Sequence, residues 1–224
     1  AEKAVNAYNT LKDNGMKVFI GTVTTGACLS VVSQTKADNM FQITPSASAA
    51  KVIANDNCFQ VCFTDPNQGT ASADYIASKG LATKVAVIYN SSDAYSSGIY
   101  DNFKAEAAAK GLDLVASEAF TGDSKQDFSS QLSKIKASGA ELIFLPIYYQ
   151  EASLILSQAK NAGITAKFFG CDGLDGLLNI ENFDKSLAEN VMLLTPFAAN
   201  ATDETTKKFV TAYNAKYDPS TLNQ

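Results

Sequence analysis

The sequence predicts an α/β protein of two lobes, each built on a doubly wound and mostly parallel sheet. Helical and strand-like hydrophobic patterns alternate along nearly all of the 224 residues, and several helical patterns end at a glycine. Serial alternation of strands and helices is typical of parallel sheets. Short loops of small polar residues follow several of the strands, which is where open α/β sheets bind ligands.

The individual elements follow from the spacing of apolar residues and from glycine stops. Apolar residues recur at helical spacing over 4–11, Gly15 ends this first helix, and a strand is expected over 16–20. The same pattern repeats to the end of the chain. Further helices are expected over 26–36, 68–79, 97–110, 128–137, 151–162 and 204–216, and further strands over 40–43, 57–63, 84–89, 112–116, 141–145, 167–170 and 191–194.

Two turn-rich stretches, 64–69 and 195–203, interrupt this alternation. Both stretches suit a chain that crosses from one lobe to the other. We therefore expect a partial, discontinuous first lobe from residues 1–65 and 196–224, and a second lobe from residues 66–195. A cleft between two such lobes suits ligand capture by closure.

The composition removes several classes of chemistry. The chain has no His and no Trp, and all 18 basic residues are lysines, so Arg is absent as well. Without imidazole there is no Ser-His or Cys-His nucleophile pair and no histidine metal site, and without Arg there is no bidentate clamp for phosphate. A net charge of −5 with scattered lysines argues against a nucleic-acid partner. No glycine-rich nucleotide loop is present, so we expect neither cofactor nor metal.

The four cysteines are interpreted as buried thiols. Cys58 and Cys62 lie in one expected strand, where four residues span roughly 13 Å, too far for a disulfide between them. Their spacing, without His or a second cysteine pair, is poor for zinc. We expect a packing role for Cys171 as well.

Several motifs, taken together in their order and spacing, resemble the type I periplasmic binding proteins of ABC importers, and within them the leucine/isoleucine/valine-binding group. The resemblance runs along essentially the whole chain. Its motifs are the helix and strand of 4–21, the loops Thr24-Thr25-Gly26 and Ile43-Thr44-Pro45-Ser46-Ala47-Ser48, the turn Phe63-Thr64-Asp65-Pro66 followed by Gln68-Gly69, the segment 93–98, the pair Tyr148-Tyr149, and Gly170-Cys171-Asp172-Gly173.

This resemblance implies a two-lobed type I periplasmic-binding-protein fold whose terminal lobe is incomplete here, because the family's first strand-loop-helix and its closing elements have no counterpart. It also implies an extracytoplasmic protein, in the periplasm or lipid-anchored at the outer face of the membrane. Such a protein is not an enzyme: it captures an amino acid, first of all a branched-chain or other aliphatic one, and delivers it to a membrane permease.

Alternative functions and ligands remain open at the level of sequence. The same fold serves as the ligand-binding sensor domain of receptors. An enzyme would have to use Asp172 and Asp175 as an acid-base pair. Small polar amino acids, aromatic amino acids and other carboxylates are further candidate ligands.

The resemblance also assigns ligand contacts to two loops of the first lobe. Thr24 and Thr25, together with Ser46, Ala47 and Ser48, match positions that hold the ligand's α-carboxylate and part of its α-ammonium. Neutral donors at a helix N-terminus can hold a carboxylate in a chain without Arg. The alternative is that Thr25 and Ser48 are only the N-caps of their helices.

In the second lobe, the resemblance assigns the ligand's ammonium to Asp172, which stands where leucine-type binders have Glu. The alternative is an ordinary capping or turn aspartate. Tyr95 and Tyr148 match positions whose rings line the pocket, against the alternative that they only pack.

If the family's first strand is the central one of its lobe, the strand Lys17–Gly21 has an open edge. We therefore expect the chain to self-associate through this edge.

Overall fold

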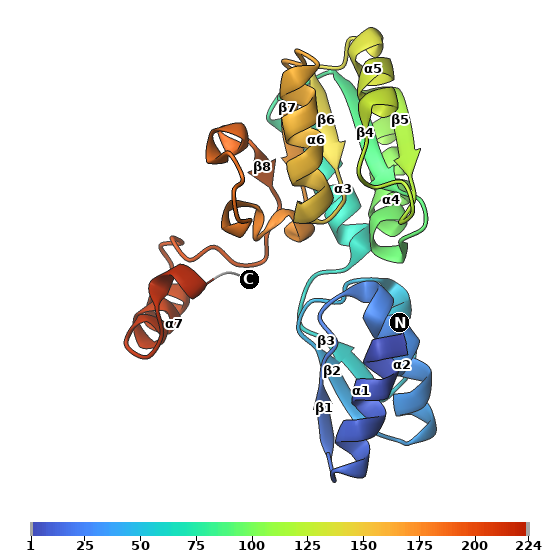
Figure 1. Cartoon of the computed structure of the whole chain (residues 1–224), viewed down its shortest axis with the longest axis vertical. Helices are drawn as coiled ribbons and strands as arrows, with labels where there is room; N and C mark the ends of the chain where they lie inside the picture. The colour runs from blue at the N-terminus through green and yellow to red at the C-terminus, as the bar shows by residue number, and fades with distance from the viewer. Residues whose placement is uncertain (1, 223–224) are drawn as a thin grey trace.

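The computed structural model describes residues 2–222, which form two separate parallel sheets with the helices beside them (Figure 1). The smaller, N-terminal sheet has the order β1-β2-β3, and helices α1 and α2 pack against it. Its elements are α1 (Glu2–Asp13), β1 (Val18–Ile20), α2 (Thr25–Ala37), β2 (Phe41–Thr44), the 3-10 turn η1 (Ala50–Ile53) and β3 (Cys58–Gln60).

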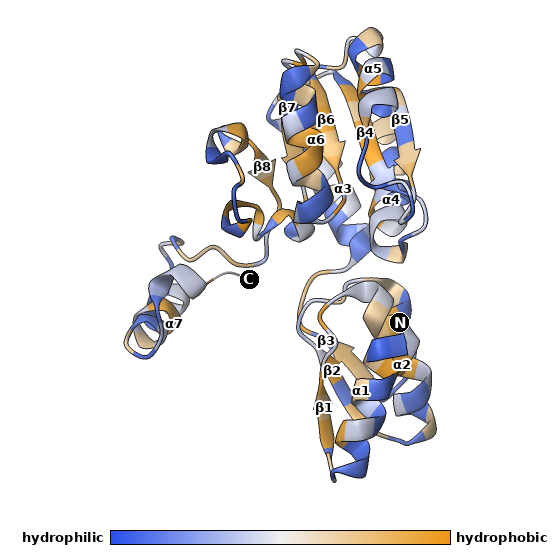
Figure 2. Ribbon diagram, viewed as in Figure 1, coloured by the Kyte–Doolittle hydropathy of each residue, from blue (hydrophilic) through white to orange (hydrophobic). Residues whose placement is uncertain are grey.

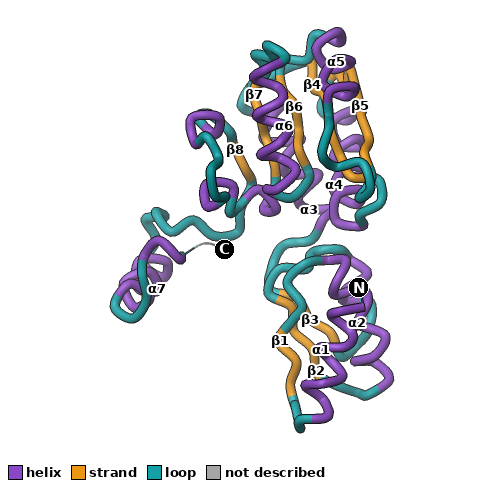
Figure 3. The backbone as a smooth tube through the Cα atoms, in the orientation of Figure 1, coloured by secondary structure: helices purple, strands orange, loops and turns teal. Residues whose placement is uncertain are grey.

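The larger sheet has the order β5-β4-β6-β7-β8, with every pair parallel. Helices α3 and α4 cover one face and α5 and α6 cover the other, so this sheet is doubly wound as predicted (Figure 3). Its elements are α3 (Asp65–Ser78), β4 (Lys84–Asn90), α4 (Ala94–Ala109), β5 (Asp113–Phe120), α5 (Ser129–Ser138), β6 (Leu142–Leu145), α6 (Tyr149–Asn161), β7 (Lys167–Gly170), the 3-10 turns η2 (Asp172–Leu174), η3 (Leu177–Asn179) and η4 (Lys185–Ala188), and β8 (Met192–Leu193).

The strand order of the larger sheet creates a crevice at its carboxyl edge. The chain runs outward from β4 to β5 on one side and then returns to place β6 on the other side. The loops after β4 and β6 therefore diverge, and such a switch point is where open α/β sheets bind ligands. The loop after β7 opens onto the same edge.

The smaller sheet differs from the prediction of a doubly wound lobe, because its described helices cover only one face. Phe19 of β1 is buried under the helices, whereas Ile20, its neighbour in the strand, is 75% exposed. Phe41 and Phe59 stack on the open face with ring centroids 5.4 Å apart. Figure 2 shows the apolar colour along β1 on this lobe. The open face is thus apolar without a covering layer in the described part of the chain.

Several predicted boundaries were wrong. The helix expected over 97–110 already begins at Ala94, and the strand expected over 57–63 ends at Gln60. The stretch 64–69 was expected to be a turn, but α3 already begins at Asp65, because the Thr64 hydroxyl accepts the Asn67 N–H (3.4 Å) and Pro66 fits the first turn. The strand expected over 112–116 continues to Phe120, because β5 pairs with β4 along its whole length.

The last helix, α7 (Glu204–Asn214), stands apart from both sheets in Figure 1, and none of its residues is buried. Its aromatic side chains contact one another and their neighbours: Phe209 meets Phe197 edge to face, and Tyr213 contacts Tyr217. The division into lobes of 1–65 with 196–224, and of 66–195, therefore stays a prediction.

The cysteines are free thiols. Cys28, Cys58 and Cys171 are buried, and Cys62 is half-buried. Burial raises the pKa of Cys58 and of Cys62 to about 11, so both are neutral at physiological pH.

Candidate functional site

A cleft of about 520 Å³ lies between the carboxyl edges of the two sheets. The smaller lobe contributes the start of α2 and the loop after β2, and the larger lobe contributes the loops and turns after β4, β6 and β7. The lining residues are Val23, Thr24, Thr25, Ser46 and Ser48 from the smaller lobe, and Tyr95, Tyr148, Tyr149, Gln150, Asp172, Gly173, Asp175, Gly176, Asn179 and Ile180 from the larger lobe.

The smaller lobe presents the N-terminus of α2 to the cleft. Thr24 is the N-cap, and the first bond of the helix ladder runs from the Cys28 N–H to the Thr24 carbonyl (3.0 Å). The N–H groups before Cys28 therefore lie outside the ladder and carry the positive end of the helix dipole. This end of α2 suits a negatively charged group.

The Thr25 hydroxyl joins α2 to the loop after β2. Its Oγ1 accepts the N–H groups of Ser48 (3.1 Å) and Ala49 (3.3 Å). The N-caps of α2 and η1 are Thr24 and Ala49, so neither Thr25 nor Ser48 is an N-cap. The capping alternative is wrong: both residues line the cleft, and the Thr25 hydroxyl also holds the loop after β2 in place.

The loop 46–48 divides into two lining residues and one supporting residue. Ser46 and Ser48 line the cleft, whereas Ala47 is fully buried and does not. The Ala47 N–H donates to Thr44 Oγ1 (3.0 Å), and its carbonyl accepts the Cys62 thiol (3.6 Å). Its backbone groups are therefore engaged within the protein instead of being presented to a ligand, which differs from the prediction for this residue.

The larger lobe presents the carboxylate of Asp172 at the start of η2. Its Oδ1 accepts the Tyr95 hydroxyl (2.6 Å), and its N–H donates to Gln68 Oε1 (3.4 Å). Burial raises the pKa of Asp172, and the hydrogen bond from Tyr95 and the nearby Gln68 side chain lower it in part. The N-cap of η2 is Cys171, so the alternative of a capping aspartate is wrong as well.

Two tyrosines and a glycine hold this carboxylate in place. The Tyr95 hydroxyl accepts the Gly173 N–H (2.9 Å), and burial raises the pKa of Tyr95 well above its usual value, so the phenol stays neutral and donates to Asp172. A Cβ on Gly173 would lie 2.7 Å from the Ile147 carbonyl oxygen, so this position requires glycine. The rings of Tyr95 and Tyr148 stack with centroids 4.8 Å apart and form an aromatic wall.

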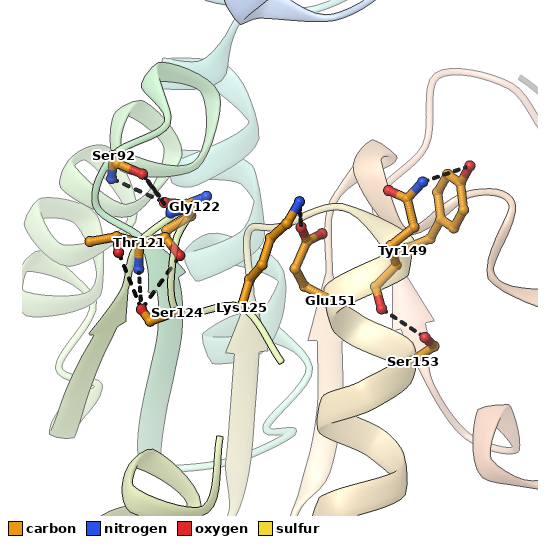
Figure 4. Close-up of polar contacts among 10 residues, drawn as sticks. Ser92, Thr121, Gly122, Ser124, Lys125, Tyr149, Glu151 and Ser153 are labelled. Atoms are coloured by element: carbon orange, nitrogen blue, oxygen red, sulfur yellow. Dashed lines mark hydrogen bonds and ion pairs between the residues drawn. The ribbon is translucent and has the colours of Figure 1, made fainter. Parts of the chain in front are cut away.

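The rim of the larger lobe is held by polar contacts between its loops (Figure 4). Lys125, in the loop after β5, reaches Oε1 of Glu151 in the first turn of α6 (3.3 Å). The Ser92 hydroxyl, after β4, accepts the Gly122 N–H (2.9 Å). These contacts tie the loops after β4, β5 and β6 into one edge.

Sequence reasoning did not assign several of the lining residues, among them Val23, Asn179 and Ile180. Val23 lies directly before the loop Thr24-Thr25-Gly26, whose residues were predicted to contact the ligand. Asn179 and Ile180 reach the cleft because Gly176, at a φ of 94°, turns the chain back into η3. Short turns of this kind carry no hydrophobic periodicity, so no sequence signal marked these two. Within residues 2–222 no group of three Cys, Asp or Glu side chains is arranged to hold a metal ion.

Comparison with known proteins bears on the same fold and cleft. A family model described as "Periplasmic binding protein" matches residues 1–224. The chain belongs to this family. A Leu/Ile/Val-binding protein homologue of Brucella melitensis is 33% identical over 175 residues, which cover 77% of this chain and 47% of the homologue. A leucine-, isoleucine-, valine-, threonine- and alanine-binding protein of Pseudomonas aeruginosa is 27% identical, over 98% of this chain and 58% of that protein.

Solved structures confirm the type I periplasmic-binding-protein fold. The leucine-binding protein LivK of Thermotoga maritima superposes with a TM-score of 0.83 at 26% identity, over 96% of this chain and 62% of that one. LivJ of Streptococcus pneumoniae, solved with isoleucine, superposes with a TM-score of 0.83 at 26% identity, over 97% of this chain and 62% of that one. This periplasmic binding protein thus spans about half to three-fifths of the length of these relatives.

Proposed function

We propose that this chain is the ligand-binding part of an extracytoplasmic solute-binding protein of an ABC importer. It captures an amino acid, branched-chain or otherwise aliphatic, between its two lobes and delivers it to the membrane permease. The observation that carries the proposal is the polarity of the cleft. The start of α2 offers N–H groups and hydroxyls on one side, and Asp172 offers a carboxylate on the other.

A zwitterion satisfies both sides of such a cleft at once. Its carboxylate would meet the N-terminal donors of α2, where the helix dipole favours negative charge. Its ammonium would meet the carboxylate of Asp172, because a hydrogen bond between two charged groups is stronger than one between neutral groups. No lysine is among the lining residues of the described chain, so a ligand with a second carboxylate would lack a cationic partner.

The side chain of the ligand is assigned from the walls and from the relatives. The stacked rings of Tyr95 and Tyr148 give an apolar surface, and Val23 and Ile180 add aliphatic groups. The names of the Brucella and Pseudomonas relatives include leucine, isoleucine and valine, and the Streptococcus structure holds isoleucine. An aliphatic amino acid therefore fits best.

The role as a binding protein, not an enzyme, is supported by the use of the two candidate acids. Asp172 is engaged by Tyr95, and Asp175 Oδ1 accepts the Gly176 N–H (2.9 Å). The relatives named above are binding proteins. Membership of the periplasmic binding proteins supports an extracytoplasmic location, and none of the helices among residues 2–222 is long and apolar enough to span a membrane.

A thermal-shift screen with the twenty amino acids, sugars and small organic acids, followed by calorimetry on each hit, tests the proposal. A ligand at about a hundred times its Kd adds roughly 2.7 kcal/mol to the free energy of unfolding, a shift of a few degrees. We expect leucine, isoleucine and valine to raise the Tm most. Stabilisation by a sugar, with no response to any amino acid, would contradict the proposal.

A further inference from the structure

The carboxyl group of Asp65 is buried without a partner at the point where the chain crosses between the lobes. Asp65 is the first residue of α3 and is 1% exposed. Neither of its carboxyl oxygens has a hydrogen-bond partner among residues 2–222. On α4, a Cβ at Gly98 would lie 3.3 Å from Oδ2, so the absence of a side chain there leaves room for the carboxyl group.

Asp65 lies between the two halves of the ligand site. Its N–H donates to the Ser48 carbonyl (2.9 Å), which ties it to the donor loop of the smaller lobe. Ser48 is 1% exposed and lines the cleft, and its hydroxyl makes no hydrogen bond within 3.5 Å in the described chain. The charge of Asp172, on the other wall, is one of the causes that raise the pKa of Asp65.

The two charged groups that act on Asp65 are both acidic. Asp172 of η2 and Asp93, which caps α4, act on it, and its charge in turn acts on Tyr148 at the start of α6 and on the thiols of Cys62 and Cys171. No lysine is among these groups. Burial, with the charges of Asp172 and Asp93, raises the pKa of Asp65 to about 7, although the nearby Ser48 hydroxyl lowers it in part.

We infer that Asp65 is a proton-linked positioning residue, which gives up its proton to solvent when a zwitterionic amino acid enters the cleft. The inference rests on the proposed function, because it needs a ligand ammonium at Asp172. An unpaired buried carboxylate is costly, so without ligand Asp65 is mostly the neutral acid below pH 7. A positive charge at Asp172 stabilises the ionised form of its neighbour Asp65.

The Ser48 hydroxyl connects the ligand ammonium to the Asp65 carboxylate. When a ligand ammonium donates to Ser48 Oγ, the hydroxyl hydrogen must point elsewhere, and a small rotation aims it at the Asp65 carboxylate. The bound state then has an ionised Asp65 that accepts from Ser48, with the released proton taken up by the buffer. Affinity therefore rises with pH through the neutral range.

Calorimetry with leucine at pH 7, in phosphate and in Tris, tests the inference, because the two buffers differ in ionisation enthalpy. The wild-type chain should release roughly half a proton at pH 7, and Kd should fall about five- to tenfold between pH 6 and pH 8 if the ligand lowers the Asp65 pKa by about one unit or more. Asp65→Asn should bind leucine without proton release. Asp93→Asn, a matched control at the neighbouring acid, should keep the release.

A wild-type Kd that is equal at pH 6 and pH 8, or an Asp65→Asn variant that still releases the proton, would overturn the inference and leave the proposed function in place. Failure to bind any amino acid would overturn both. If Asp65→Asn does not fold, wild-type chain labelled with ¹³C in its aspartate carboxyls decides the matter. One carboxyl should titrate near pH 7 without ligand and at lower pH with leucine, and an unchanged midpoint would refute the coupling.

The pH dependence of unfolding provides a second test of whether Asp65 titrates near neutral pH. The pKa of Asp65 is raised on folding, so the folded chain holds a proton that the unfolded chain loses above about pH 4. The wild-type chain should therefore lose stability relative to Asp65→Asn as pH rises from 4 to 7, with no further change above. Parallel Tm profiles of the two proteins would show that Asp65 does not titrate near neutrality.

Discussion

Each wall of the cleft is suited to one charged end of a ligand, and the two walls use different chemical groups. The wall of the smaller lobe has no charged side chain among its lining residues and uses backbone N–H groups and hydroxyls at the start of α2. The wall of the larger lobe uses a buried carboxylate, Asp172, fixed by Tyr95. Because the two walls favour opposite ends of a zwitterion, a ligand with both charges gains most from bringing the lobes together.

The walls also differ in what keeps them rigid. On the donor wall, Thr25 Oγ1 accepts from Ser48 and Ala49, so the protein's own N–H groups fix the hydroxyl. On the acidic wall, an aromatic stack and the close approach of Gly173 fix the hydroxyl of Tyr95 that donates to the carboxylate. A chain without Arg thus positions both halves of an amino-acid site with neutral groups and one acid.

Asp172→Asn should give the largest effect, because it removes the charge of the acidic wall and leaves its shape. Losing one partner of a buried charge pair costs about 2–5 kcal/mol, so leucine affinity should fall on the order of thirtyfold to several thousandfold. Calorimetry measures this change. Asp123→Asn, at an exposed loop position, is the matched control and should bind as the wild type does. Equal affinities for both variants would remove Asp172 from its role.

Tyr95→Phe should come next, because it keeps the ring stack and removes only the hydroxyl. A hydrogen bond to a charged group contributes about 1.5–3 kcal/mol, and its loss leaves Asp172 less well held and harder to ionise. We expect weaker leucine binding with a steeper loss below neutral pH, read by calorimetry at several pH values. Tyr149→Phe removes a hydroxyl from the same rim and should change affinity much less.

Thr25→Val tests the donor wall with an isosteric change. It leaves the N–H groups of Ser48 and Ala49 without their acceptor, which costs about 1–3 kcal/mol when such groups are buried. Stability in urea should fall together with leucine affinity. Unchanged urea unfolding with normal binding would mean that α2 and the loop after β2 hold their positions without this hydroxyl.

Self-association through β1 should be the smallest effect. The strand lies at the edge of the smaller sheet, and Val18 and Ile20 are exposed on the open face. We expect light scattering to show dimers at high concentration, and Ile20→Lys to abolish them. A monomer at all concentrations, with rapid amide exchange over Val18–Ile20, would contradict the prediction.

The sequence predicted best the elements whose burial restricts them to apolar residues. β6 is an unbroken apolar run, because a parallel strand covered on both faces has no polar side, and its predicted bounds lie within one residue of the observed ones. The start of α3 was missed because Thr64, Asp65 and Pro66 are turn formers as well as helix starters. Only the tertiary position of the segment decides between the two.

For the site, the order of the loops was predictable and the hydrogen-bond partners were not. The structure brings Thr24, Thr25, Ser48 and Asp172 to one cleft, although their contacts with a ligand stay predictions. The position of Ala47 depends on the hydrogen bond that its N–H donates to Thr44 Oγ1, which no periodicity encodes. The burial of Asp65 likewise depends on the packing of α4 at Gly98.

The most direct test of the account compares three ligands that differ only in their charged ends: leucine, 4-methylpentanoate without the ammonium, and 3-methylbutylamine without the carboxylate. Calorimetry on the wild-type chain and on Asp172→Asn should show tight binding only for leucine with the wild type. The variant should lose affinity for leucine and for the amine, and bind 4-methylpentanoate no worse than the wild type does. Equal losses for leucine and 4-methylpentanoate in Asp172→Asn would contradict the assignment of the ammonium to this wall.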